Sequence, residues 1–96
     1  MEFHYYVYLL ASGPCGYLYV GITDDLLRRM HEHKSFVTPN CHTARYNIVN
    51  LMYYEVFTDV MQAIKREKQL KKWRRNWKFN LIEKSNPTWR DLTPTL

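Results

Sequence analysis

Residues 5–34 read YYVYLLASGPCGYLYVGITDDLLRRMHEHK, and this stretch decides the N-terminal half of the fold. Residues 4–11 and 17–22 are rich in β-branched and aromatic side chains, and the SGPCG between them has turn chemistry, which predicts a β-hairpin with a longer loop. Thr23 or Asp24 then supplies an N-cap for a helix that runs to about residue 34, with two acids in its first turn.

The remaining chain adds a third strand and two more helices. Residues 35–46 show no clear period and are interpreted as a loop, whereas NLMYYEVF at 50–57 suits a strand. The Thr58-Asp59 pair caps a helix that extends to about residue 73, and a third helix over 77–84 ends at Asn86-Pro87. The order β-β-α-β-α-α contains a hairpin and too few strands for a doubly wound sheet. We therefore predict an α+β fold, a small three-stranded antiparallel sheet flanked by helices.

Length, charge and cysteine content limit the functional classes. Ninety-six residues form one domain, 1–96, and 46% apolar residues predict a packed core. A formal net charge of +5 makes a polyanion the first partner to consider, and nucleic acid is the commonest one. Cys15 and Cys41 form no CxxC pattern and fit a reduced cytosolic protein. The N-terminus lacks a basic n-region and the run VYLLA is too short for a bilayer, so we expect a soluble, cytoplasmic protein without membrane attachment.

The first helix places two polar residues beside its apolar stripe. A helical wheel puts Leu26, Leu27 and Met30 on the stripe, with Arg28 and Glu32 opposite as a solvent-facing pair. Arg29 and His33 are also four positions apart and fall together on the flank of the stripe. They are either surface and boundary residues or two groups of a polar pocket.

The second helix carries an acid where apolar residues are expected. Val60, Ala63, Ile64 and Leu70 define its apolar face, and Glu67 falls near the middle of that arc, while the other charges point away except Lys71 at the edge. A carboxylate on such a face needs a cation or a metal as its partner. Either an arginine or a hard divalent metal would satisfy Glu67.

The tyrosines of the two strands raise a second question. Tyr6 and Tyr8 share one strand face by the period of two, and Tyr17, Tyr19 and Gly21 share a face of the next strand. Packing explains several phenols. It does not explain Gly21, which weakens a strand unless some group must approach the backbone closely.

A basic segment, KREKQLKKWRRNWK at 65–78, holds eight of the fourteen lysines and arginines and one acid. In one interpretation these charges are solvated side chains on a helix, and Trp73 or Trp77 packs into the core. In the other, the charges form a face that follows a phosphate backbone without sequence specificity. The second interpretation makes a set of residues candidates for nucleic-acid binding: Lys65, Arg66, Lys68, Lys71, Lys72, Arg74, Arg75, Lys78 and Asn80.

These features together resemble the GIY-YIG nuclease superfamily, in particular its small stand-alone bacterial proteins, which are related to the N-terminal nuclease domain of bacterial excinuclease and to GIY-YIG homing endonucleases. Tyr6-Val7-Tyr8 and Tyr19-Val20-Gly21 are similar to the paired signature triplets, and Arg29, His33 and Glu67 follow at family-like positions. KFNLIEKSNPTWRDL at 78–92 looks like the closing stretch of the stand-alone members.

The resemblance implies a phosphodiesterase site. Glu67 would hold a single Mg²⁺ or Mn²⁺, and Tyr8 would activate the attacking water as a base or by relaying its proton. Tyr19 and Arg29 would bind the phosphate, and His33 would assist proton transfer. A nearby cation, Arg29 or the metal, is expected to lower the pKa of Tyr8, which is otherwise too high for a base at neutral pH.

Some positions depart from the family pattern. The first triplet has no glycine, and the late asparagine is either Asn80, which we prefer, or Asn86. The loop VTPNCHTARY lacks an expected glycine, which leaves substrate contacts by His42 or Arg45 open. His31 and His33 face apart on a helix, so a zinc site with Cys41 and His42 is not expected.

The sequence thus predicts an endonuclease that acts on DNA in preference to RNA, with low or structure-based specificity or a protein partner that confers it, and with a possible role in DNA repair or recombination. Two alternatives stay open. In the first, the chain is a catalytically inactive nucleic-acid-binding module. In the second, it is a protein-interaction domain whose basic helix binds an acidic partner.

Overall fold

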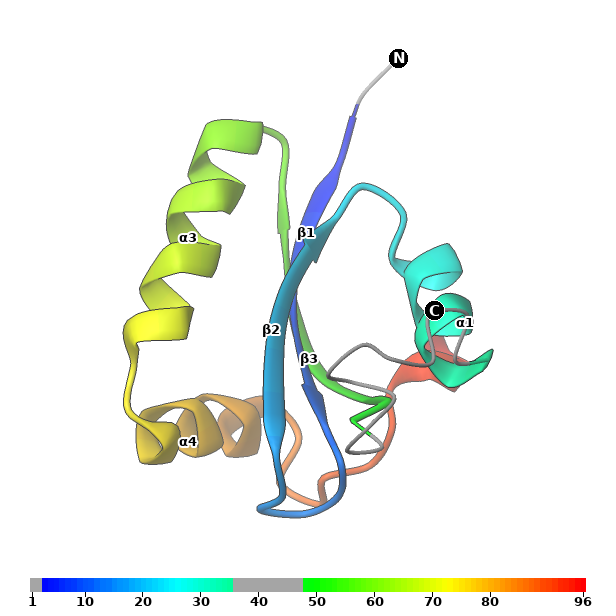
Figure 1. The fold of residues 1–96 in the computed structure, drawn as a ribbon, viewed down its shortest axis with the longest axis vertical. Coiled ribbons are helices and arrows are strands. Elements are labelled where there is room, and N and C mark those ends of the chain that lie inside the picture. The colour runs from blue at the N-terminus through cyan, green and yellow to red at the C-terminus, as the bar shows by residue number, and fades with distance from the viewer. Residues whose placement is uncertain (1–2, 36–47) are drawn as a thin grey trace.

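A three-stranded antiparallel sheet with helices on both faces forms the molecule (Figure 1). The computed structural model describes residues 3–35 and 48–96, of which Ser35 only by its backbone. The elements in chain order are β1 (Tyr5–Ala11), β2 (Leu18–Thr23), α1 (Leu26–Ser35), β3 (Asn50–Phe57), α3 (Val60–Lys72), α4 (Arg75–Ser85) and a 3₁₀ turn (Thr93–Thr95). The predicted α+β class and element order are confirmed. Most of the predicted loop, with Cys41, His42 and Arg45, lies outside the described residues.

The central strand β1 pairs with both neighbours, in the order β2-β1-β3. Tyr8, at its middle, lies opposite Gly21 of β2 and Tyr54 of β3. The register with β3 shifts between Leu9 and Leu10, where β3 carries one extra residue. Because β1 is covered on both edges and both faces, its centre is the most enclosed part of the sheet.

Alternation along β1 divides the core into two layers. Val7, Leu9 and Ala11 face α3 and α4 and pack with Ala63 and Leu70 of α3. On the other face, Tyr8 and Leu10 pack with Leu26 and Met30 of α1. Figure 1 shows this separation, with α3 and α4 on one side of the sheet and α1 with the C-terminal segment on the other. The predicted sharing of one face by Tyr6 and Tyr8 is confirmed.

The helix ends differ in detail from the predictions. The first helix begins at Leu26, so Asp24 and Asp25 precede it and its first turn contains no acid. Asp25 is the capping residue, because its Oδ1 accepts from the Arg28 backbone N–H at 3.1 Å. Thr23 instead shapes the preceding turn by accepting from the Asp25 backbone N–H. For α3 the predicted cap is confirmed, since the Asp59 carboxylate accepts from the Met61 N–H.

Fewer residues of the apolar helix stripes are buried than the helical wheels predict. Leu26 and Met30 are buried, but Leu27 is 47% exposed, and Val60 at the start of α3 is also exposed. Both lie in the first turn of their helix, and only part of each predicted arc meets the core. None of the helices within residues 3–35 and 48–96 has the length and apolar character needed to cross a membrane.

The C-terminal segment returns to the sheet through two polar residues. Asn86 is buried, and its amide donates to the backbone carbonyls of Met52 and Arg90. Asp91 accepts from the Leu51 N–H and pairs with Lys34 Nζ at 2.6 Å. These bonds hold the C-terminal segment and the end of α1 to the same strand, β3.

Candidate active site

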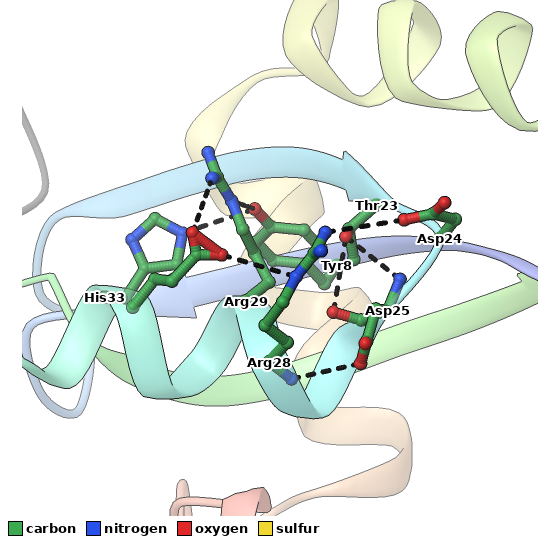
Figure 2. Close-up of polar contacts among 8 residues, drawn as sticks. Tyr8, Thr23, Asp24, Asp25, Arg28, Arg29 and His33 are labelled. Atoms are coloured by element: carbon green, nitrogen blue, oxygen red, sulfur yellow. Dashed lines mark hydrogen bonds and ion pairs between the residues drawn. The ribbon is translucent and has the colours of Figure 1, made fainter. Parts of the chain in front are cut away.

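Tyr8 is the centre of a polar cluster on the α1 face of the sheet. Its side chain is 1% exposed, and its Oη lies 3.3 Å from Nε2 of His33. The Arg29 Nε–H donates to the same Oη at 3.4 Å. Figure 2 shows both side chains reaching from α1 to the phenol. The structure thus brings together three of the five residues that the family resemblance assigns to catalysis.

The position of α1 explains why Arg29 and His33 converge. Leu26 and Met30 anchor the helix in the core, and residues three or four positions further lie next to that stripe. His33 is buried and Arg29 half-buried, so both leave the helix at the boundary between core and solvent. The prediction that they project side by side from the edge of the core is confirmed.

Tyr19 of β2 completes the ring of aromatic groups. Its ring centroid lies 6.3 Å from that of Tyr8 and 5.7 Å from that of His33. The contact with His33 is edge-to-face, a favourable arrangement for such rings. Tyr19 remains partly exposed, so its side chain lines the outer side of the cluster.

Gly21 provides the space that the Tyr8 phenol occupies. A β-carbon added to Gly21 would lie 2.3 Å from both Cζ and Oη of Tyr8, far inside any real contact. The group that approaches the Gly21 backbone closely, which the sequence could not name, is therefore the Tyr8 ring.

The environment raises the pKa of Tyr8 to about 12. Burial is the largest cause because it disfavours the phenolate, and the hydrogen bond from Arg29 opposes it only in part. The expectation that Arg29 lowers the pKa of Tyr8 below its ordinary value is wrong for the protein alone. Tyr8 holds its proton firmly at neutral pH.

The protein lowers the pKa of His33 and raises the pKa of Arg29. Burial, followed by the nearby Arg29 charge, lowers the pKa of His33, so the imidazole is neutral at pH 7. The hydrogen bond to Tyr8 is the largest influence on Arg29 and raises its pKa, so it stays a cation. Arg29 can only donate, so Tyr8 Oη accepts there and its single proton is free to point to His33 Nε2. In the His33 tautomer with an unprotonated Nε2, His33 is then the proton acceptor of the pair.

Glu32 lies next to Arg29 of the polar cluster, although the helical wheel predicts it on the solvent-facing side of the helix. Its carboxylate lies 3.6 Å from Arg28 Nε, as predicted, but also 3.7 Å from Arg29 Nη1. The spacing of three positions between Arg29 and Glu32 was the available signal. The acid holds the outer end of the Arg29 guanidinium while Nε faces Tyr8.

Glu67 belongs to α3, the helix that Figure 1 shows on the opposite side of the sheet from α1. Its side chain is only 16% exposed, so the carboxylate is partly buried beside the core, and Lys71 Nζ lies 3.4 Å away. Arg66, one position earlier, reaches Glu55 on the edge strand β3. Successive helical residues differ by about 100°, and Ala63 and Leu70 mark the direction of the core. Glu67 therefore faces the flank opposite to that of Arg66, towards β2.

A divalent metal at Glu67 would have one protein carboxylate. Within the described parts of the chain, no three His, Cys, Asp or Glu side chains gather as a ready-made metal centre. Mg²⁺ commonly binds through one or two carboxylates and completes its shell with water and substrate phosphate. The donor type and the single carboxylate at Glu67 fit such an ion.

Some cations of the basic segment bind other groups of the protein, and others line a groove. Arg66 does not point away as predicted, because its guanidinium donates to both carboxylate oxygens of Glu55 at 2.9 Å. Arg75 donates to the carbonyls of Cys15 and Gly16 and so ties α4 to the hairpin loop. A groove of about 640 Å³ along α3 and the end of β3 is lined by Phe57, Gln62, Lys65, Arg66, Lys68, Gln69 and Lys72.

The two candidate asparagines have different environments. Asn86 is fixed inside the protein by the backbone bonds described above, which is a structural role. Asn80 is exposed on α4, beside Trp77 and Lys84. Of the two, Asn80 is the one whose amide faces solvent.

Comparison with known proteins places the chain in a family. A family model described as the GIY-YIG catalytic domain matches residues 4–80. The chain is 34% identical over 83 residues to a UPF0213 protein of Bacillus pumilus, covering 86% of this chain and 84% of that one. It is 35% identical over 82 residues to a UPF0213 protein of Syntrophus aciditrophicus, with coverages of 85% and 92%.

A solved structure agrees with these matches. The solution NMR structure of a UPF0213 protein from Bacillus halodurans is similar, with a TM-score of 0.57, 26% identity and 94% coverage of both chains. The signature triplets around Tyr8 and Gly21 lie in the matched region and build the cluster described above. The chain therefore belongs to the GIY-YIG family, among relatives that carry the name UPF0213.

Proposed function

We propose that this protein is a metal-dependent endonuclease that hydrolyses phosphodiester bonds in DNA. The observation that carries the proposal is the enclosed cluster of Tyr8, Arg29 and His33, in which a fixed cation and a neutral imidazole meet one phenol. Phosphodiester hydrolysis needs an activated water and positive charge on the phosphate. The family to which the chain belongs supplies the reaction class.

In this mechanism Tyr8 relays a proton and does not act as a free base. With a pKa of about 12, Tyr8 does not ionise by itself at neutral pH. Its Oη would take a proton from the attacking water while its own proton moves to His33 Nε2, 3.3 Å away. The water oxygen then bonds to phosphorus as the bond to the leaving sugar oxygen breaks, and that oxygen takes a proton from solvent water. His33 ends the step as the imidazolium.

Arg29 and Tyr19 would bind the phosphate. The guanidinium is half-exposed and permanently charged, so it can contact a phosphate oxygen while Nε stays on Tyr8. Charge fixed in advance at the place where charge develops is the most effective stabilisation of such a transition state. Glu67 would hold Mg²⁺ or Mn²⁺, which supplies further positive charge to the phosphate when bound.

The cations of the groove along α3 would follow the DNA backbone. Lys65, Lys68 and Lys72 line the groove beside Phe57, and such contacts give affinity without sequence readout. Specificity would be low, structure-based or conferred by a protein partner. A nuclease of this kind would suit DNA repair or recombination, where the structure of the DNA marks the target.

The test is cleavage of labelled duplex, single-stranded and branched DNA with Mg²⁺ or Mn²⁺. Wild type should cut at least one substrate, and Glu67→Gln should lose the activity while it still binds DNA. Asp24→Asn removes an exposed carboxylate near α1 and is the matched control, which should cut normally. A chelator should stop cleavage reversibly. Cleavage that survives in Glu67→Gln, or that needs no metal, would overturn the assignment of Glu67.

A second candidate is a nucleic-acid-binding module without activity. The ion pair between the Glu67 carboxylate and Lys71, which engages the proposed metal ligand, is the observation that favours it. It predicts salt-sensitive DNA binding by wild type with no metal-dependent cleavage on any of the three substrates. Absence of both binding and cleavage would instead indicate a protein-interaction domain.

A further inference from the structure

The exposed tryptophan on α4 needs an explanation that packing does not give. Trp73 is half-buried against the core, whereas Trp77 is 52% exposed. The two rings meet edge-to-face, with centroids 5.9 Å apart and an angle of 84° between their planes. Trp73 therefore supports the Trp77 ring from one side and leaves much of the indole in water. The prediction that one of the two tryptophans packs is confirmed for Trp73.

The surroundings of Trp77 are basic and slightly hollow. A hollow of about 280 Å³ is lined by Trp73, Trp77, Asn80, Leu81 and Lys84. The guanidinium of Arg74 lies over the Trp77 ring, 6.0 Å from its centroid. This volume is close to the lower limit of small-molecule pockets, about 300 Å³. An apolar hollow of this size with cations at its rim suits one planar ring attached to an anion.

The hollow lies beside the basic groove on α3. The Arg66 guanidinium lies 5.0 Å from the centroid of Trp73, and Arg66 also lines the groove with Lys68 and Lys72. The Arg66–Trp73 contact is thus the shared wall of the two depressions. A phosphate backbone in the groove would bring its next base to the tryptophans.

We propose that Trp77 stacks with an unpaired base, so that the protein takes single-stranded DNA, or DNA with an unpaired segment, as its substrate. Within a duplex both faces of each base are already stacked, so the interior of a duplex offers Trp77 no free base face. A single strand offers one base face to the indole, and aromatic side chains use such faces without sequence preference. The exposed Asn80 amide beside the ring can donate to and accept from the edge of that base. This inference rests on the proposed function, since it names the form of DNA that the nuclease would bind.

The experiment measures binding by fluorescence anisotropy in the presence of a chelator, so that nothing is cleaved. The probes are a labelled oligothymidylate, a blunt duplex of the same length, and an abasic oligomer with the same number of phosphates. Trp77→Ala should bind the oligothymidylate about 5- to 100-fold more weakly. Trp77→Phe should retain most of the affinity, and Met61→Ala, at an exposed position on α3, should bind as wild type.

The three probes separate stacking from charge. If Trp77 stacks with a base, Trp77→Ala binds the duplex and the abasic oligomer as tightly as wild type does. Equal losses on all three probes, or no loss on the oligothymidylate, would overturn the inference. Quenching of tryptophan fluorescence by oligothymidylate gives a second readout in the folded wild type, and it should fall in Trp77→Phe.

Failure of this inference is distinguishable from failure of the proposed function. Duplex binding and metal-dependent cleavage that are indifferent to Trp77 would reject only the stacking site. A wild-type protein that binds none of the three probes would reject the nucleic-acid substrate and the stacking site together.

Discussion

Gly21 and Tyr8 face each other across the β1–β2 pair, and a β-carbon on Gly21 would lie 2.3 Å from the Tyr8 Oη. The glycine is therefore the reason that a tyrosine can lie across this strand pair with its hydroxyl directed to His33 and Arg29. Substitution at Gly21 tests the geometry of the site without removing any of its functional groups.

Gly21→Ala should abolish cleavage, whereas it should lower the free energy of unfolding only in part. The Tyr8 ring must move, which breaks its alignment with His33, and overpacking of this kind costs about 1–3 kcal/mol of the free energy of unfolding. Urea denaturation and cleavage assays on the same preparations measure both effects. Gly13→Ala is the control, because a β-carbon there has no neighbour within 4 Å. Normal cleavage by Gly21→Ala would show that the position of Tyr8 is not critical.

Tyr8→Phe should lower kcat by at least about 100-fold, since it removes the hydroxyl that relays the proton. The loss of the hydrogen bonds to the neutral His33 and the cationic Arg29 should reduce stability by about 1.5–3 kcal/mol. Tyr6→Phe is the matched control: Tyr6 lies on the same strand face and stacks edge-to-face with Tyr54. Single-turnover cleavage separates the chemical step from binding. Equal activities of the two phenylalanine variants would exclude a relay through Tyr8.

The pH dependence of kcat/KM should report His33. Burial and the Arg29 charge lower its pKa from 6.5, and only the neutral ring can accept the Tyr8 proton. Activity should fall as pH decreases through a midpoint below 6.5, and this acid limb should be absent from the residual activity of His33→Gln. No alkaline limb is expected up to about pH 9, because the pKa of Tyr8 is about 12. A midpoint at or above 6.5 in wild type would contradict the neutral imidazole.

Two cations of α3 should respond to substitution in opposite ways. Lys68→Ala removes an exposed charge of the groove, so it should reduce the slope of log K against log salt for duplex DNA by about 0.9 and leave stability unchanged. Arg66→Ala breaks the paired contacts with Glu55 and should cost about 2 kcal/mol in urea denaturation. Arg66→Lys keeps the charge but loses the forked geometry, so it should recover only part of that stability. An unstable Lys68→Ala with an unchanged slope would reverse these two roles.

Much of the architecture could be predicted because it depends on local periodicity. The strand alternation around Tyr8, the third strand at Asn50–Phe57 and the Asp59 cap are properties of short segments, and the structure agrees with each. The pairing of Arg29 with His33 follows from the helical repeat alone. The width of an apolar stripe does not follow from the helical repeat. Leu27 belongs to the predicted stripe of α1, but it is exposed because of how α1 packs on the sheet.

The sequence by itself determined which side chains share a face, since the periods of strands and helices are set by the backbone. Only the tertiary structure decided what those faces meet. Glu55 engages Arg66, Gly16 near the hairpin turn engages Arg75 from 59 positions away, and Asn86 is buried under β3. The tertiary structure also decided the sign of the Tyr8 pKa shift, because burial by residues distant in the chain outweighs the nearby cation. Contacts of this kind depend on how whole elements pack, and no repeat within a single segment encodes them.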